Sequence, residues 1–505
     1  MRTRVSAESI HEMETQLAIV YAFEGTDKLN GATAGVDAAL GGHISELICS
    51  GDINGELGET TLLYPRGMIP AQRVLVVGLG AYERFGVGPL RRAIKKAARS
   101  LRGLRPTSFA SVACPVGETG LTSERVAQTL VEGMILGLYE YVEYKTEDGL
   151  STAQPVVEEI VLVDEDVTRL GESEVGARAG RAVGQAVHLT KDLVNRPASH
   201  ATPSYLAAQA EEIAGQYGMH FGALGPAEMR DEGMGALLGV ARGSHEEPRL
   251  IILDHDPHGR SAAPLVFVGK GITFDSGGLS LKSVAAIETM KADMAGGAAV
   301  LGAMSAIGAL GLEQRVVAIV PATENMPGGR ACHPGDIVRS VIGKTIEVLN
   351  TDGEGRLILA DALGYARRFE PAAIVDVATM TGISRCALGH KGLAMFANDD
   401  ALAERVVAAS EATQERVWRF PLWEEFADLI RSDVADMQNC SGLGSGGPEG
   451  AMLLSQFTEG CAWAHLDFGA MGITKEVSDG VVVRTPSGWG TRLLIEIARQ
   501  WTSAV

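Results

Sequence analysis

The sequence predicts a two-domain α/β protein. We expect a smaller N-terminal α/β domain and a larger C-terminal domain built on a mostly parallel central sheet covered by helices on both faces. Length is the first reason, because 505 residues exceed what one hydrophobic core usually accommodates. The second reason is the alternation of short apolar runs with longer segments of helical periodicity, which is typical of parallel strands joined by helices.

The N-terminal α/β domain is expected at residues 1–170. Apolar runs bounded by turn residues predict strands at 16–23, 60–65, 73–80, 108–116 and 158–165. Helical periodicity predicts helices between these strands, at 88–103 and 123–141.

The connection between the domains is expected to be helical. The helical pattern of 172–195 stops before Arg196-Pro197, because the residue before a proline disfavours helical backbone. We therefore place a connecting helix within 171–200 and the C-terminal domain at 201–505.

In the C-terminal domain, apolar runs predict strands at 249–256, 264–271, 315–322, 345–350, 372–380 and 461–469. Helical periodicity predicts helices at 288–310 and 355–369. The Gly-Ser stretch from Ser441 to Gly450 predicts a surface loop. In open α/β sheets ligands bind beyond the carboxyl ends of the strands, and the polar clusters of this sequence follow predicted strands.

Composition and charge exclude several classes of protein. Hydrophobic residues make up 46% of the chain and charged residues 21%, which excludes a disordered protein. A formal net charge of −19 disfavours nucleic acid and anionic membrane surfaces as partners. No apolar segment is long enough to span a membrane, and the six cysteines form no C-x-x-C pair. A cytoplasmic protein without nucleic-acid or membrane partners is therefore expected.

The first polar cluster follows the strand predicted at 264–271. Residues 269–282 combine Lys270, Asp275 and Lys282 with four glycines, so charged groups lie on bare backbone at the sheet edge. A glycine-rich turn with solvated charges is the alternative interpretation.

The second cluster precedes an apolar helix. Asp293 follows Met290 by three residues, so a carboxylate and a thioether share one helical face. An acid in the first turn could instead serve only to interact with the helix dipole.

The third cluster follows the strand predicted at 345–350. In an extended segment Asp352 and Glu354 point the same way, and Arg356 then begins a helix whose N-terminus favours an anion. Two acids and an arginine between a buried strand and a buried helix are difficult to explain as residues that only aid solubility.

If Asp275, Asp293, Asp352 and Glu354 converge, their mutual repulsion must be neutralised, and two divalent cations would do so. Such an oxygen-rich set suits magnesium or manganese and tolerates zinc or cobalt. Lys270 could add an amine ligand, because nearby dications lower the pKa of a lysine.

These segments resemble the leucyl aminopeptidase family. Residues 350–357, N-T-D-G-E-G-R-L, are similar to the N-T-D-A-E-G-R-L signature of that family, and 269–282 resemble its other metal-binding segment. Further similar segments occur in the order of the family, at 325–329, 333–336 and 463–467. The resemblance spans roughly 190–495, whereas the N-terminal half agrees only in α/β alternation and length.

The resemblance implies a metal-dependent aminopeptidase that releases N-terminal residues from short peptides. By analogy, Lys270, Asp275, Asp293 and Glu354 hold one ion, and Asp275, Asp352 and Glu354 hold the other. Manganese or zinc is expected first, and magnesium or cobalt is also possible. A water or hydroxide bridging the two ions would be the nucleophile.

The resemblance also assigns the catalytic side chains. Lys282 would add positive charge at the oxyanion, and Arg356 would hold a bicarbonate that acts as the proton shuttle, together with Gly355 and Leu357 at the helix start. A homohexamer built as a dimer of trimers is implied by the same resemblance.

Around the side-chain pocket of the family the sequence has Met290, Thr379, Gly382 and Ile383. Ile383 is large where the family often has a small residue, so a preference for leucine is left open. Gly353 stands where the family usually has alanine, which removes no ligand.

Two other functions are compatible with the sequence. Paired dications also clamp phosphoryl groups, so a two-metal phosphoesterase is one alternative, and a non-catalytic binding protein on the same scaffold is the other. All five candidate metal ligands and both catalytic side chains are present, which favours the enzyme. His465 lies inside an apolar strand and is expected to be a core residue.

Overall fold

The computed structural model describes residues 1–505 except for 114–119, 147–156, 260–262, 443–445, 479–480 and 502–505. The chain divides into two compact units, Met1–Gln185 and Ala186–Val505. The division falls within helix α5, Leu170–Asn195, which confirms the helix predicted at 172–195. In the described part of the chain, no helix is both long enough and apolar enough to cross a bilayer.

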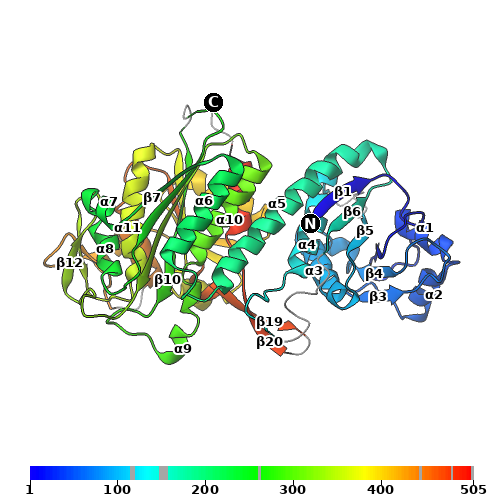
Figure 1. Ribbon diagram of the computed structural model, residues 1–505, viewed down its shortest axis with the longest axis horizontal. Coiled ribbons are helices and arrows are strands. Elements are labelled where there is room, and N and C mark those ends of the chain that lie inside the picture. Colours follow the sequence, from blue (N-terminus) through cyan, green and yellow to red (C-terminus); the bar gives the residue numbers. More distant parts are fainter. Residues whose placement is uncertain (114–119, 147–156, 260–262, 443–445, 479–480, 502–505) are drawn as a thin grey trace. The chain divides into compact units, whose positions relative to one another are not determined.

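The first unit is built on a six-stranded sheet (Figure 1). Its strands are, in spatial order, β1 (Arg2–Ser6), β6 (Glu159–Val163), β5 (Ser108–Val112), β2 (Ala18–Ala22), β4 (Val74–Gly78) and β3 (Thr60–Leu63). Neighbours pair in parallel except at the edge strand β3, which is antiparallel to β4. The sequence did not predict β1, because this edge strand is partly exposed and lacks an apolar run.

Four helices accompany this sheet: α1 (Gly31–Ala39), α2 (His43–Ser50), α3 (Val87–Leu104) and α4 (Ser123–Leu138). The amphipathic helix α3 buries its apolar stripe and packs against α4. Small residues allow this contact, since a Cβ at Gly137 would lie 2.5 Å from the Cβ of Ala98.

The second unit is built on a nine-stranded mixed sheet. Its main path runs through β16 (Val417–Arg419), β15 (Leu393–Ala397), β18 (Trp463–Asp467), β14 (Ala373–Ala378), β9 (Leu265–Gly269), β11 (Val316–Asn325), β8 (Arg249–His255) and β7 (His220–Leu224). The ninth strand, β10 (Gly271–Asp275), extends β9 and pairs in parallel with the end of β11. The central strands are parallel to one another, and β15, β8 and β7 introduce the antiparallel pairs.

Helices cover both faces of this sheet (Figure 1). On one face α10 (Ala295–Leu310) packs against α6 (Pro203–Tyr217) and α15 (Thr491–Arg499), and α15 packs against α13 (Asp400–Thr413). On the other face α11 (Glu354–Ala366) packs against α8 (Gly235–Ala241) and α14 (Gly446–Ser455). The remaining helices are short: α7 (Pro226–Asp231), α9 (Val284–Ile287) and α12 (Ile383–Leu388). The predicted α/β architecture with two domains is confirmed.

Several predicted elements are corrected by the structure. The run at 345–350 forms β13 (Thr345–Val348), which lies in a small separate sheet with β12 (Asp336–Arg339) and β17 (Met437–Gln438). The helix predicted at 288–310 is a 3-10 turn at Met290–Ala292 followed by α10. The loop predicted at Ser441–Gly450 is wrong from Gly446 onward, where α14 begins. The glycines of this segment suggested a loop. In the structure Gly447 and Gly450 lie within α14, where their lack of a side chain lets Ile383 and Met380 pack closely against the helix.

Candidate metal centre

Polar side chains follow the carboxyl ends of the central strands. Lys270 joins β9 to β10, Asp275 ends β10, Asn325 ends β11, Thr379 follows β14 and Asp467 ends β18. These strands are parallel neighbours, so their carboxyl ends meet at one edge of the sheet. This edge is where ligands bind in open α/β sheets.

Lys270 is the centre of the buried part of the site. Its side chain is almost fully buried, and its Nζ lies 2.8 Å from Asp293 Oδ2 and 2.8 Å from Glu354 Oε1. The ammonium also donates to the carbonyl of Thr379 at 2.9 Å. Burial alone would lower the pKa of Lys270, but the surrounding carboxylates, led by Asp293 and Glu354, raise it well above its usual value.

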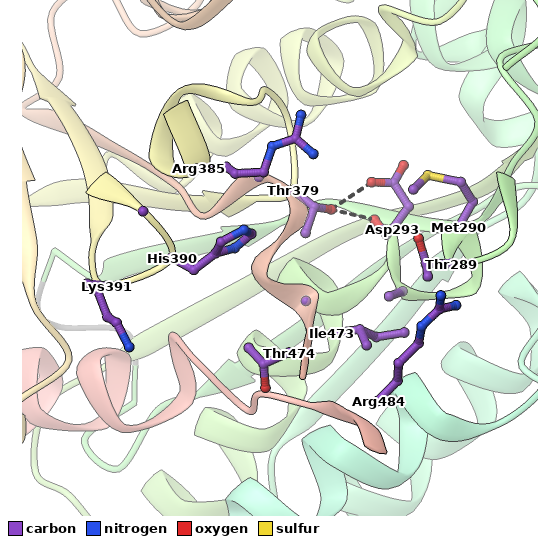
Figure 2. A pocket seen from close by; sticks show the side chains of 14 residues that line it. Thr289, Met290, Asp293, Thr379, Arg385, His390, Lys391, Ile473, Thr474 and Arg484 are labelled. Carbon is purple, nitrogen blue, oxygen red and sulfur yellow. Dashed lines mark hydrogen bonds between the residues drawn. The ribbon is translucent and has the colours of Figure 1, made fainter. Parts of the chain in front are cut away.

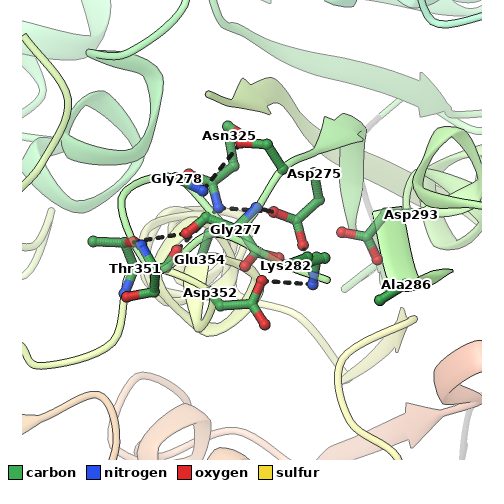
Figure 3. A network of polar contacts seen from close by, with 12 residues as sticks. Asp275, Gly277, Gly278, Lys282, Ala286, Asp293, Asn325, Thr351, Asp352 and Glu354 are labelled. Carbon is green, nitrogen blue, oxygen red and sulfur yellow. Dashed lines mark hydrogen bonds and ion pairs between the residues drawn. The ribbon is translucent and has the colours of Figure 1, made fainter. Parts of the chain in front are cut away.

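Lys282 holds the more open part of the site (Figure 3). Its Nζ lies 2.7 Å from Asp275 Oδ2 and 2.6 Å from Asp352 Oδ1. We call these two lysines together with Asp275, Asp293, Asp352 and Glu354 the lysine–carboxylate cluster. All four predicted acids therefore converge, each within ion-pair distance of a lysine.

Glycines bring the backbone of α10 against the strands that carry this cluster. The amide of Gly297 donates to the carbonyl of Lys270 at 2.7 Å. A Cβ at Gly296 would lie 2.2 Å from the carbonyl oxygen of Val377, a distance at which the helix would have to move. Similarly, a Cβ at Gly355 would lie 2.8 Å from Lys270 Nζ. The start of α10 and the start of α11 can thus both approach Lys270.

The cluster has the charge and donor set of a divalent-cation site. Its four carboxylates face only two ammonium groups, and Asp275, Asp293 and Glu354 offer oxygens that lie within 4.8 Å of one another. Glu354 Oε2 is buried and has no hydrogen-bonding partner among the described residues. Burial raises the pKa of Asp293 well above its usual range, and Glu354 raises it further. A bound cation would relieve this excess of negative charge, so the residues fit a metal.

Asp352 differs from the other three acids. It is only partly buried, and it lies outside the group of three carboxylates that could share one ion. It precedes Glu354 in a turn, and the helix begins at Glu354, one residue before the range predicted at 355–369. Its carboxylate approaches the other acids through Lys282 (Figure 3).

Two residues that the sequence analysis missed hold the acids in place. Asn325 donates through Nδ2 to Asp275 Oδ1 at 2.8 Å and to the carbonyl of Thr351 at 2.9 Å, joining the first cluster to the third. Asp467 accepts bonds from the amides of Met380 and Thr381, and thus fixes the loop after β14. The available signals were the position of both residues at strand ends and their place in the segments 325–329 and 463–467, which resemble the family but were given no role.

Arg356 is buried in the first turn of α11. Its Nη1 donates to Glu449 Oε1 and to the carbonyl of Asn439, both at 2.5 Å. Its Nε is buried and has no hydrogen-bonding partner among the described residues. Glu449 lies on α14, in the segment that the sequence analysis assigned to a loop, so this partner was missed. The side chain of Leu357 packs in the apolar core.

A cavity of about 600 Å³ opens beside Asp293 (Figure 2). Met290 and Thr379 line it, and Thr379 Oγ1 donates to Asp293 Oδ1 at 2.7 Å. Gly382 and Ile383 are not among the residues that line it. Ile383 instead faces α14, because a Cβ at Gly447 would lie 2.6 Å from its Cδ1.

Fold and site together define an enzyme of the metal-dependent class, with buried acids at the carboxyl edge of an α/β sheet. The description "Cytosol aminopeptidase family, catalytic domain" belongs to the family profile that matches residues 188–495, and the N-terminal domain of that family matches 19–148. The chain belongs to the cytosol aminopeptidase family. It is therefore a metal-dependent aminopeptidase, a hydrolase that acts on peptide bonds.

Related proteins are similar to this chain over nearly its whole length. A probable cytosol aminopeptidase of Roseiflexus castenholzii is 42% identical over 468 residues, which are 93% of this chain and 95% of the relative. The bottromycin maturation enzyme BotP, in complex with Mn, is 33% identical, with a TM-score of 0.83, covering 96% of this chain and 99% of that chain. A mutant of tomato leucine aminopeptidase is 32% identical, with a TM-score of 0.85, covering 98% and 96%.

Proposed function

We propose that this aminopeptidase uses two divalent ions and releases the first residue of short peptides. One observation carries the proposal: four carboxylates converge on two lysines, and Glu354 Oε2 is left buried without a partner. The oxygen-rich donor set suits manganese, and the relative BotP has been solved in complex with Mn. Zinc, magnesium and cobalt are compatible with the same donors.

The proposed ligand sets are those that the family resemblance implies, and the ion pairs of the cluster support them by bringing their members together. Lys270, Asp275, Asp293 and Glu354 would hold one ion, and Asp275, Asp352 and Glu354 would hold the other. Lys270 would bind as the neutral amine, because the bound ions would lower its pKa and displace its proton. Asp275 and Glu354 belong to both sets, which agrees with the short separation of their oxygens. When bound, the ions would lower the pKa of a bridging water that attacks the peptide carbonyl, and would stabilise the charge that develops on its oxygen.

The remaining roles fall to side chains of this chain. Lys282 Nζ, between Asp275 and Asp352, would place positive charge beside the developing oxyanion. Asn325 keeps Asp275 in position through a 2.8 Å hydrogen bond. Thr379 holds the carboxylate of Asp293 and accepts from Lys270 through its carbonyl.

We assign Arg356 to the binding of a bicarbonate that shuttles the proton. Its buried Nε has no acceptor among the described residues, so an added anion could accept from it. The first turn of α11, with Gly355 and Leu357, offers a positive helix end to the same anion. Glu449 holds Nη1 and thereby fixes the direction of the guanidinium group.

Assembly and location are part of the same proposal. We assign residues 201–505 to the catalytic domain, 171–200 to the connecting helix and 1–170 to the N-terminal domain. A homohexamer formed as a dimer of trimers is what the family resemblance implies, and the name cytosol aminopeptidase, which the relatives carry, supports a cytoplasmic location. Sedimentation of the full-length protein would test the hexamer directly.

Hydrolysis of a panel of aminoacyl amides tests the activity. The protein is first treated with a chelator, then supplied with manganese, zinc, magnesium or cobalt, with N-acetylated amides and a phosphodiester as controls. We expect metal to restore cleavage and N-acetylation to abolish it. Cleavage of the phosphodiester alone would instead identify a phosphoesterase, and metal binding without any hydrolysis would contradict the proposal.

A further inference from the structure

The cavity beside Asp293 has walls of opposite charge (Figure 2). Its inner end is formed by Met290, Thr379 and Asp293, next to the lysine–carboxylate cluster. Four basic side chains from two separate segments of the second unit also line the cavity: Arg385, His390 and Lys391 on one side, and Arg484 on the side of Thr289. Asp293 is the one acidic residue among the described residues that line the cavity.

The basic side chains are largely available to a ligand. Arg385, His390 and Lys391 are exposed, and neither Arg385 nor Lys391 makes an ion pair within the described part of the chain. Arg484 Nη1 lies 2.8 Å from Glu288 Oε1, but both side chains are about half exposed, so this pair is weak and can exchange. By contrast, Asp293 is already paired with Lys270 and Thr379.

This concentration of positive charge needs an explanation beyond solubility. The chain as a whole has a formal net charge of −19, so a cavity lined by four basic side chains and one acid opposes the general trend of the sequence. Arginine and lysine donors grouped around one concave site suit a carboxylate, and arginine can bind it with two parallel hydrogen bonds. The acidic inner end, in turn, suits the amine of a peptide.

We propose that the cavity binds the side-chain carboxylate of an acidic first residue, so that the enzyme prefers peptides beginning with glutamate or aspartate. The proposal rests on the aminopeptidase function proposed above. The free α-amine would lie toward Asp293, and the side-chain carboxylate would reach toward Arg385 and Lys391. The cavity of about 600 Å³ is large enough for such a side chain, and Gly469 and Gly472 add no bulk to its wall.

The test compares amides that differ only in charge. We would measure kcat/KM for the glutamyl and glutaminyl amides of one fluorogenic amine, with the leucyl amide as a reference for peptidase activity. The parent enzyme should prefer glutamyl over glutaminyl amide by about 10-fold, the size expected for one charge-assisted hydrogen bond. Arg385→Gln and Lys391→Gln should each lower this ratio, because each removes a positive charge that would bind the glutamyl carboxylate. A ratio is used because it cancels any loss of folded enzyme.

Arg431→Gln is the matched control. Arg431 is exposed and lies outside the cavity, so its replacement should leave the ratio unchanged. A parent ratio of one or less, or a ratio unaffected by both cavity variants, would overturn the proposal. A preference seen only when the acid is the second residue, in leucyl-glutamyl against leucyl-glutaminyl amide, would overturn the assignment to the first residue.

A failure of the proposed aminopeptidase function would give a different result from a failure of the carboxylate site. If no amide is cleaved in the presence of metal, the leucyl amide included, the peptidase assignment fails. The cavity is then tested by calorimetric titration of the metal-loaded protein with glutamate and with glutamine. Tighter binding of glutamate that disappears in Arg385→Gln supports the carboxylate site, and equal binding of the two contradicts it.

Discussion

Two buried charge clusters of the second unit differ in their balance. In the first, Asp376 on β14 faces His465 on β18, with Asp376 Oδ1 2.5 Å from His465 Nδ1, and Trp463 Nε1 donates to Asp376 Oδ2 at 2.7 Å. The carboxylate thus has a partner for each oxygen and faces one imidazole, so the charges of this cluster can balance, although His465 Nε2 has no hydrogen-bonding partner among the described residues. In the lysine–carboxylate cluster, four acids share two lysines, and Glu354 Oε2 has no described partner.

Buried charges that stabilise the fold therefore differ from buried charges that bind a ligand. A balanced buried cluster stabilises the fold without further ligands, and His465 is the core residue that the sequence predicted. An unbalanced cluster costs stability unless something else supplies positive charge. We therefore expect changes in the first cluster to affect unfolding, and changes in the second to affect metal binding and catalysis.

Glu354→Gln should produce the largest effect. The substitution keeps the shape of the side chain but removes a ligand proposed to be shared by both ions. We expect kcat/KM for the leucyl amide to fall by ~10³-fold, or ~4 kcal/mol of transition-state stabilisation. Metal content per chain should fall with it. In chelator the free energy of unfolding should stay equal or rise, because one charge leaves an acid-rich cluster. Normal activity with full metal content would refute the ligand assignment.

Asp376→Asn is the counterpart in the balanced cluster. Both donors around Asp376 lose a charged acceptor, so the free energy of unfolding should fall by about 1–3 kcal/mol in urea titrations. The folded variant should still bind as much metal as the parent. A variant that loses metal while keeping its stability would show that the two clusters are not functionally distinct.

Asn325→Ala should have a smaller effect on the metal centre. Asn325 orients Asp275 but is not itself a proposed ligand. Loss of such a positioning residue typically weakens metal binding by 10- to 100-fold, and we expect this size in the manganese titration. Asn325→Asp, which keeps the size and adds a charge, is the companion variant. If both variants bind manganese like the parent, the positioning role is wrong.

Asp361 supplies the most gradual effect, because it is spread over several pH units and is small at each step. The amides of Leu237 and Val341 donate to it at 2.8 Å, and no cation among the residues that the structure describes offsets its burial. Burial raises the pKa of Asp361 to about 7. The carboxyl therefore holds its proton more tightly in the folded chain, and stability should decline as the pH rises from about 4 to 7, by up to ~1.4 kcal/mol per pH unit.

Asp361→Asn should remove this part of the pH dependence. Urea unfolding of chelated parent and variant at several pH values between 4.5 and 7.5 measures it. If the free energies of unfolding of parent and variant change with pH in parallel across this range, the carboxyl is already ionised in the folded protein.

Much of the fold and the main acids could be predicted from the sequence, because local patterns encode them. Apolar runs identified β9, β11, β14 and β18, and the polar residues after them had to meet at one edge of a parallel sheet. Strand β1 and the separate sheet of β13 could not be predicted, since pairing partners are set by tertiary contacts rather than by local pattern.

The supporting residues were harder to predict than the acids. Asn325 and Glu449 contact residues 50 and 93 positions away in the chain, and no local pattern specifies such partners. Glu449 follows a Gly-Ser stretch that is typical of loops, yet α14 begins at Gly446. The four basic residues of the cavity come from two segments that only the fold brings together.

Divalent ions are expected to balance the negative charge of the lysine–carboxylate cluster. The most direct test is the titration of chelated protein with manganese, followed by calorimetry and by elemental analysis of the dialysed product. We predict two ions per chain in the parent, with a raised melting temperature, and loss of this binding in Glu354→Gln. A parent that binds no manganese, or a Glu354→Gln variant that binds two ions as tightly as the parent, would contradict the account.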